Sequence, residues 1–135
     1  MKLLLIAGLL FGFASVTSSK SEQADQSVNM EDRQLVHTVF FWLKDKDSET
    51  DAQKLYEGLK MIKDIPEVME GYIGVPAVAG RSVIDGSYDF SITFIFEDQE
   101  AEQAYQVHPD HLKFVDEYSS LWERVIVYDA VSPER

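Results

Sequence analysis

The sequence predicts an α+β domain whose elements follow the order β-α-β-β-α-β. Three segments rich in aromatic and β-branched residues, at 35–43, 88–96 and 124–131, indicate strands, and a weaker glycine-flanked segment at 71–80 indicates another. Apolar stripes at helical spacing follow the first strand and precede the last. This order is that of the ferredoxin-like fold, an antiparallel four-stranded sheet with helices on one face.

The first 19 residues are typical of a secretory signal. Lys2 provides a positive start, an apolar run follows from Leu3 to Ala14, and small residues continue through Ser19. The run is too short to span a bilayer, which needs roughly 20 residues. A buried N-terminal helix is the alternative, but the polar residues behind the run argue against it. We therefore expect residues 1–19 to be a signal peptide, residues 20–34 a flexible linker, and the mature protein to be exported, either periplasmic or secreted.

The first strand and the first helix follow from local pattern. Residues 35–43, LVHTVFFWL, form the richest β-branched and aromatic run near the start of the domain. Ser48 precedes the helix with Asp51 three residues later, a capping pattern. An apolar stripe then marks the inward side of this helix: Leu55, Leu59 and Ile62.

The second half of the domain is punctuated by turn and break signals. Pro76 confines the strand expected at 71–80 to a sheet edge or a bulge, and Asp85-Gly86 indicates a turn before the strand at 88–96. Pro109 splits the following helical region into two short helices, and RVIVYDAV at 124–131 forms the last strand.

The first strand is apolar on both sides, although helices cover only one face of such a sheet. Val36, Phe40 and Trp42 alternate with Val39, Phe41 and Leu43. A soluble monomer would not leave such a face in water, so we expect it to meet a second copy of the chain in a homodimer.

Composition restricts the partners further. The formal net charge is −12, which disfavours binding to nucleic acid and, once the signal is removed, to anionic membranes. The chain has no cysteine, which excludes disulfides and a lipid anchor on cysteine.

The stretch AYQVHPDHLKFVDEY holds two of the three histidines. Helical spacing directs Tyr105 and His111 inward, with His111 on a stripe that continues through Phe114, Val115, Tyr118 and Trp122. His37 lies on the same side of the first strand as Val39 and Phe41, where it could meet His111. A hydrogen-bonded core histidine is the ordinary alternative for each of them. His108 and His111 could also suggest a metal site, but Pro109 kinks the chain between them and no third ligand is evident, so we expect no metal.

Several landmarks together resemble a known family. VHTVFFWLK, Pro66 after the first helix, SYDFSITFIFED, AYQVHPDHLKFV and VIVYDAV follow the order found in the stress-responsive dimeric α/β-barrel (Dabb) domain, which the chain resembles over residues 35–132. The resemblance implies a ferredoxin-like subunit whose dimer closes two sheets into a dimeric α/β barrel.

The resemblance also implies candidate site residues. Many family members have no assigned reaction, but a plant polyketide cyclase of the family uses a histidine as general base and a tyrosine that assists, without any cofactor. The matching residues here are His111 and Tyr105 as catalytic candidates. We expect His37, His108 and Phe114 to be ligand-binding residues. The first helix, which lines the pocket in that enzyme, diverges here.

Two functions follow as expectations. The first is an exported Dabb homodimer that binds a small, apolar molecule in a pocket between helices and sheet. The alternative is a cofactor-independent, polyketide-cyclase-like lyase with His111 as general base and Tyr105 assisting.

Overall fold

The computed structural model describes residues 33–78 and 80–133. The predicted signal peptide and nearly all of the predicted linker lie outside the described residues. The strands are β1 (Leu35–Leu43), β2 (Glu70–Gly74), β3 (Phe90–Phe96) and β4 (Trp122–Val131), and the helices are α1 (Glu49–Lys63), α2 (Gln99–Val107) and α3 (Pro109–Tyr118). A 3₁₀ turn over Ser119–Leu121 joins α3 to β4. The predicted element order is confirmed.

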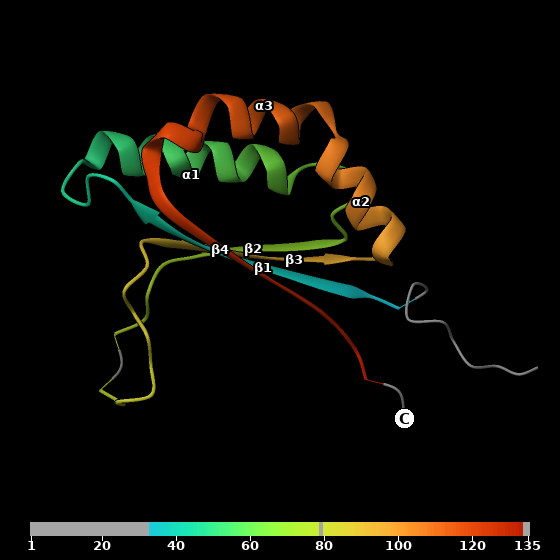
Figure 1. Cartoon of the computed structure of the whole chain (residues 1–135), viewed down its shortest axis with the longest axis horizontal. Coiled ribbons are helices and arrows are strands. Elements are labelled where there is room, and N and C mark those ends of the chain that lie inside the picture. The colour runs from blue at the N-terminus through green and yellow to red at the C-terminus, as the bar shows by residue number, and fades with distance from the viewer. Residues whose placement is uncertain (1–32, 79, 134–135) are drawn as a thin grey trace, which may run out of the picture.

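The four strands form one antiparallel sheet in the order β2-β3-β1-β4, and the helices pack on one of its faces (Figure 1). The predicted ferredoxin-like fold is therefore confirmed. Two strands are shorter than expected. β2 ends at Gly74, because Pro76 has no N–H to donate to a ladder. β3 begins at Phe90, and the Asp89 carboxylate before it accepts a hydrogen bond from the Leu43 N–H at 2.7 Å. Among the described residues, no helix has the length and apolar character needed to cross a bilayer.

The core lies between the sheet and the helices. Because side chains alternate along a strand, one face of β1 and β3 directs its side chains into this core. The predicted apolar stripe of α1 packs against them from the opposite side. Its buried members include Val39, Phe41, Leu43, Ile92, Phe94, Phe96, Leu55, Leu59 and Ile62. Ser48 caps α1 as predicted, since its hydroxyl accepts a hydrogen bond from the Asp51 N–H at 3.2 Å.

The inward stripe predicted for α3 is narrower than expected. Phe114 is buried and packs with Tyr118 against α1, at the point where Gly58 lets the two helices approach. Val115 is 43% exposed, so its assignment to the stripe is wrong. The next residue in a helix is rotated by about 100°, which turns Val115 away from the face that Phe114 and Tyr118 share.

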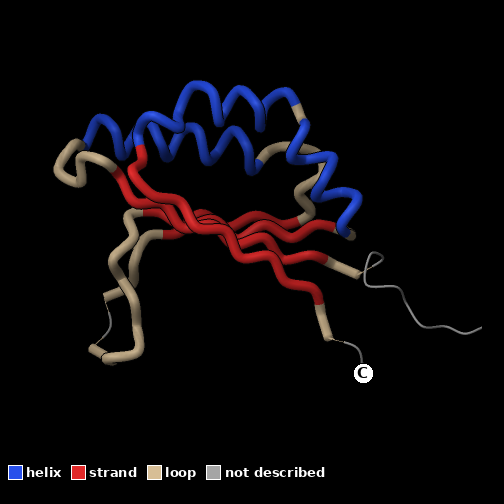
Figure 2. The backbone as a smooth tube through the Cα atoms, viewed as in Figure 1, coloured by secondary structure: helices blue, strands red, loops and turns tan. Residues whose placement is uncertain are grey.

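The opposite face of the sheet carries no helix (Figure 2). Residues 75–78 and 80–89 connect β2 to β3 and project from this open side; we call them the β2–β3 arm. The base of the arm covers part of the face that we expected to meet a second copy of the chain. The Trp42 indole N–H donates to the Ser87 hydroxyl at 3.1 Å, and Tyr88 packs on Phe40 with ring centroids 4.8 Å apart. Trp42 is consequently only 8% exposed.

Candidate functional site

Tyr105 lies at the centre of a cluster built from three elements. It points from α2 into the core, where its ring contacts His37 of β1 and His111 of α3, at centroid distances of 6.0 and 4.7 Å. Phe94 and Phe96 of β3 enclose it from below, at 6.0 and 5.0 Å. The structure thus brings together the three polar aromatic residues that the sequence directed inward.

The hydroxyl of Tyr105 is the least satisfied polar group of this cluster. The side chain is fully buried, and its oxygen has no hydrogen-bond partner among the described residues. Burial, and secondarily the negative charge of Glu102, raises the pKa of Tyr105 above its ordinary value. The hydroxyl therefore stays protonated near neutral pH and is available as a hydrogen-bond donor.

His111 is half-buried and held in one tautomer by the backbone. Its Nδ1 lies 3.0 Å from the carbonyl oxygen of Gln106. Because a carbonyl only accepts, Nδ1 carries the proton, and Nε2 of the neutral ring keeps its lone pair. Burial lowers the pKa of His111, the Gln106 hydrogen bond acts in the opposite direction, and the electrostatic interaction with His37 lowers it further to a smaller extent. A neutral imidazole with a free Nε2 can accept a hydrogen bond or a proton.

His37 is buried and paired with a carboxylate. Its Nδ1 lies 2.6 Å from an oxygen of Asp129, which stands opposite it in the β1–β4 register. The imidazole is 4% exposed, whereas the Asp129 side chain is 45% exposed. Asp129 was not among the residues predicted from the sequence, although it is the acidic residue of VIVYDAV that lies on the same strand face as Val127 and Val131.

One group of described residues has the chemistry of metal ligands. His37, Glu102 and Asp129 each offer one donor atom, and these atoms lie within 4.8 Å of one another. The two carboxylates already accept hydrogen bonds, Asp129 from His37 and Glu102 from the side-chain amide of Gln106 at 2.7 Å. Each carboxylate thus has a hydrogen-bond donor among the described residues.

The other two predicted ligand-binding residues have structural contacts. His108 has an extended backbone between α2 and α3, as expected before a proline, and its Nδ1 accepts a hydrogen bond from the Asp110 N–H at 3.1 Å. Phe114 lies in the core and stacks on Trp122. Their roles in ligand binding stay predictions.

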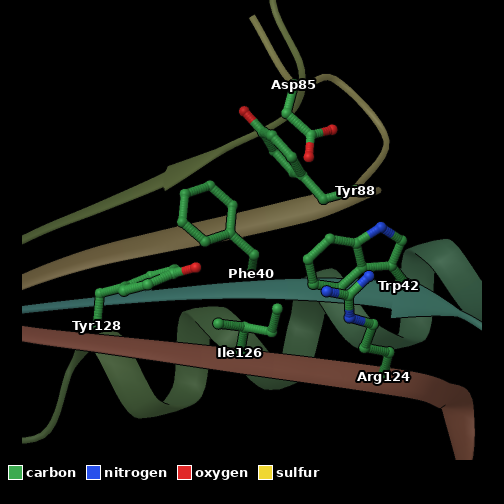
Figure 3. Close-up of a pocket in the computed structure, with 7 residues that line it drawn as sticks. All are labelled: Phe40, Trp42, Asp85, Tyr88, Arg124, Ile126 and Tyr128. Atoms are coloured by element: carbon green, nitrogen blue, oxygen red, sulfur yellow. The ribbon is translucent and has the colours of Figure 1, made fainter.

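A cavity lies on the other side of the sheet (Figure 3). It has a volume of about 290 Å³, and Arg124 lies over the Trp42 ring with its guanidinium carbon 4.4 Å from the centroid. The residues that line it are Phe40, Trp42, Asp85, Tyr88, Arg124, Ile126 and Tyr128. This cavity therefore opens on the face without helices, away from Tyr105 and His111.

Comparison with known proteins gives consistent matches. Residues 35–132 match the model of the stress responsive A/B barrel domain, Dabb. Olivetolic acid cyclase from Cannabis sativa is 33% identical over 90 residues, which cover 64% of this chain and 87% of the cyclase.

Solved structures agree on the fold. A Dabb family protein from Mesorhizobium loti with a ferredoxin-like fold is 27% identical, has a TM-score of 0.63, and aligns over 76% of this chain and 99% of its own. A protein of unknown function from Thermobifida fusca, described as dimeric and ferredoxin-like, is 18% identical with a TM-score of 0.61, over 78% of this chain and 96% of its own.

Proposed function

The chain belongs to the stress responsive A/B barrel domain family, and we propose that it is an exported homodimer that binds a small molecule beside Tyr105. The observation that carries this proposal is the buried Tyr105 hydroxyl without a partner. A buried hydroxyl that lacks a hydrogen bond costs about 1–3 kcal/mol in proteins. A ligand oxygen that accepts its hydrogen bond would offset this cost.

The surroundings of the hydroxyl indicate the character of the ligand. Phe94 and Phe96 supply an apolar wall, Tyr105 supplies a donor, and Nε2 of His111 supplies an acceptor. These groups suit a small, mainly apolar molecule that carries a carbonyl or hydroxyl oxygen. His111 is only half-buried, so the ligand would reach the Tyr105 hydroxyl from the side of the cluster on which His111 lies.

Binding can be tested with ethyl acetoacetate, a small β-keto ester, as the probe. We expect a saturable change in the ¹⁵N shift of His111 Nε2, and at least about tenfold weaker binding in Tyr105→Phe, since a lost hydrogen bond of about 1.4 kcal/mol is a factor of ten. Tyr72→Phe is the matched control, because Tyr72 is 69% exposed. Equal affinity in wild type and Tyr105→Phe would refute the assignment of the hydroxyl.

The homodimer would form through the open face of the sheet. Strand register places Glu70 and Arg124 on this face, and Asp85 of the arm lines the cavity there beside Arg124, whereas the helices on the other side expose many acidic residues. In a chain of net charge −12, a largely apolar face with few charges is the surface on which two copies repel each other least. The dimeric Thermobifida fusca neighbour supports this assembly. A monomer in sedimentation at micromolar concentration would refute it.

A second candidate is catalysis of proton transfer at carbon, favoured by the neutral His111 beside a protonated Tyr105. Nε2 of His111 would take a proton from a carbon next to a carbonyl group, and the electron pair would move to the carbonyl oxygen. The Tyr105 hydroxyl would donate a hydrogen bond to this enolate oxygen. The enolate carbon would then attack a second carbonyl carbon of the same molecule and close a ring, the π electrons of that carbonyl would move to its oxygen, and the protonated Nε2 of His111 would return its proton to this alkoxide oxygen. A ring closure of this kind agrees with the name of the relative, olivetolic acid cyclase.

This second candidate can be tested without knowing the substrate. We expect the wild type to accelerate exchange of deuterium into C2 of ethyl acetoacetate in D₂O, and His111→Ala to lose about 10²–10⁴-fold of that acceleration. Equal exchange by both proteins would exclude His111 as the base, and would leave the binding proposal standing.

A further inference from the structure

The β2–β3 arm exposes several apolar side chains on one projecting segment. Val75, Val78 and Val83 are 64%, 107% and 86% exposed. Single exposed valines are ordinary on protein surfaces, but a group of them on one segment indicates a contact with another molecule. The arm leaves the sheet on the side opposite the helices (Figure 1).

The root of the arm is fixed to the sheet. Ser87 accepts hydrogen bonds at two points, from the Trp42 indole at its hydroxyl and from Lys46 Nζ at its carbonyl oxygen, at 3.1 and 3.3 Å. The Asp89 N–H donates to the Phe41 carbonyl at 2.9 Å. These contacts set the direction in which the arm leaves the sheet, so its valines are presented at a defined place.

We propose that the β2–β3 arm clasps the second copy of the chain along the edge of its sheet. The inference rests on the proposed homodimer. Two sheets that pack face to face lie about 10 Å apart, and the six residues from Val75 to Gly80 can span up to about 20 Å. When it is extended, an arm of that reach is longer than the gap between the two sheets. It passes beside the partner sheet, and two-fold symmetry places one arm on each side of the dimer.

The charge of the arm suits this contact. Positions 75 to 84 of the arm have one charged residue, Arg81, whereas the two carboxylates of the arm, Asp85 and Asp89, accept backbone hydrogen bonds at its fixed root. An arm that extends past the partner sheet brings Arg81 towards the acidic helices of the second copy. The opposite charges attract each other there, while the valines are withdrawn from water.

The test compares two double variants of the full chain by sedimentation over a range of concentrations. Val78→Asp with Val83→Asp places two charges in the arm. Val107→Asp with Leu112→Asp places two charges at similarly exposed apolar positions on the helices, where the side chains are 69% and 55% exposed. We expect the arm variant to raise the dimer dissociation constant at least tenfold, with unchanged circular dichroism, and the helix variant to leave it unchanged.

Two outcomes would overturn the inference in different ways. A dimeric wild type whose dissociation constant is the same in the arm variant would refute the clasp and leave the homodimer standing. A monomeric wild type would refute the homodimer, and the clasp with it.

Discussion

Removing the hydroxyl of Tyr105 while keeping its ring should separate stability from binding. In Tyr105→Phe the ring contacts with Phe96 and His111, at 5.0 and 4.7 Å, are retained. The change removes an oxygen that is buried without a partner among the described residues. The free protein should therefore become more stable, while ligand binding should weaken.

The size of the gain follows from the cost of burying the oxygen. An unpaired buried hydroxyl costs about 1–3 kcal/mol, so we expect Tyr105→Phe to raise the free energy of unfolding by about 1 kcal/mol or more. For a domain of this size, that corresponds to an increase in Tm of about 4–8 °C. Thermal melts of the ligand-free protein followed by circular dichroism measure this shift. Tyr72→Phe is the control, since Tyr72 is exposed and its substitution should leave the Tm unchanged.

A loss of stability would refute this reasoning. If Tyr105→Phe lowers the free energy of unfolding by about 1 kcal/mol, the hydroxyl already has a partner in the free protein, such as an ordered water. Tyr105 would then be a satisfied core residue, and the argument for a ligand beside it would fail.

Three further changes test other parts of the site and its scaffold. His111→Ala should abolish ligand binding and change stability by less than about 1 kcal/mol in thermal melts; a larger loss would indicate a structural role for its bond to Gln106. Because burial lowers the pKa of His111 below 6.5, its contribution to stability should be complete above pH 6.5 and be lost as the pH falls through the folded-state pKa; urea unfolding at several pH values should show this decline in wild type and a weaker one in His111→Gln. Gly58→Val should destabilise the protein by about 1–3 kcal/mol, since a Cβ there would lie 3.0 Å from the rings of Phe114 and Tyr118; an unchanged melting temperature would contradict this close packing.

The parts of the site that depend on local periodicity could be predicted from the sequence. Strand alternation placed His37 on the same side of β1 as Val39 and Phe41, and helical spacing turned Tyr105 inward. Their contact could be expected if that side faced the helices, and the structure shows that it does. Asp129 could not be assigned in the same way, because its pairing with His37 depends on the register between β1 and β4, which are far apart in the sequence.

Tertiary packing explains the remaining differences. Trp42 was expected to contact a second copy of the chain, because β1 is apolar on both sides. Within one chain it is already covered by Ser87 and Arg124, which lie distant in sequence and carry no periodic signal. Val115 was expected to face inward because it was assigned to the apolar stripe that contains Phe114 and Tyr118. The part of that helix that is buried depends on tertiary packing, in which Phe114 contacts α1 at Gly58 and also Phe41 and Trp122.

Native mass spectrometry of the protein purified from its own host tests most directly whether the site beside Tyr105 holds a small molecule. We predict a dimer mass that includes a bound small molecule for the wild type, and the same dimer without that molecule for Tyr105→Phe. An identical bound mass in the two proteins would place the molecule elsewhere and contradict the account, as would a wild type that carries none and binds none of the small carbonyl compounds offered to it.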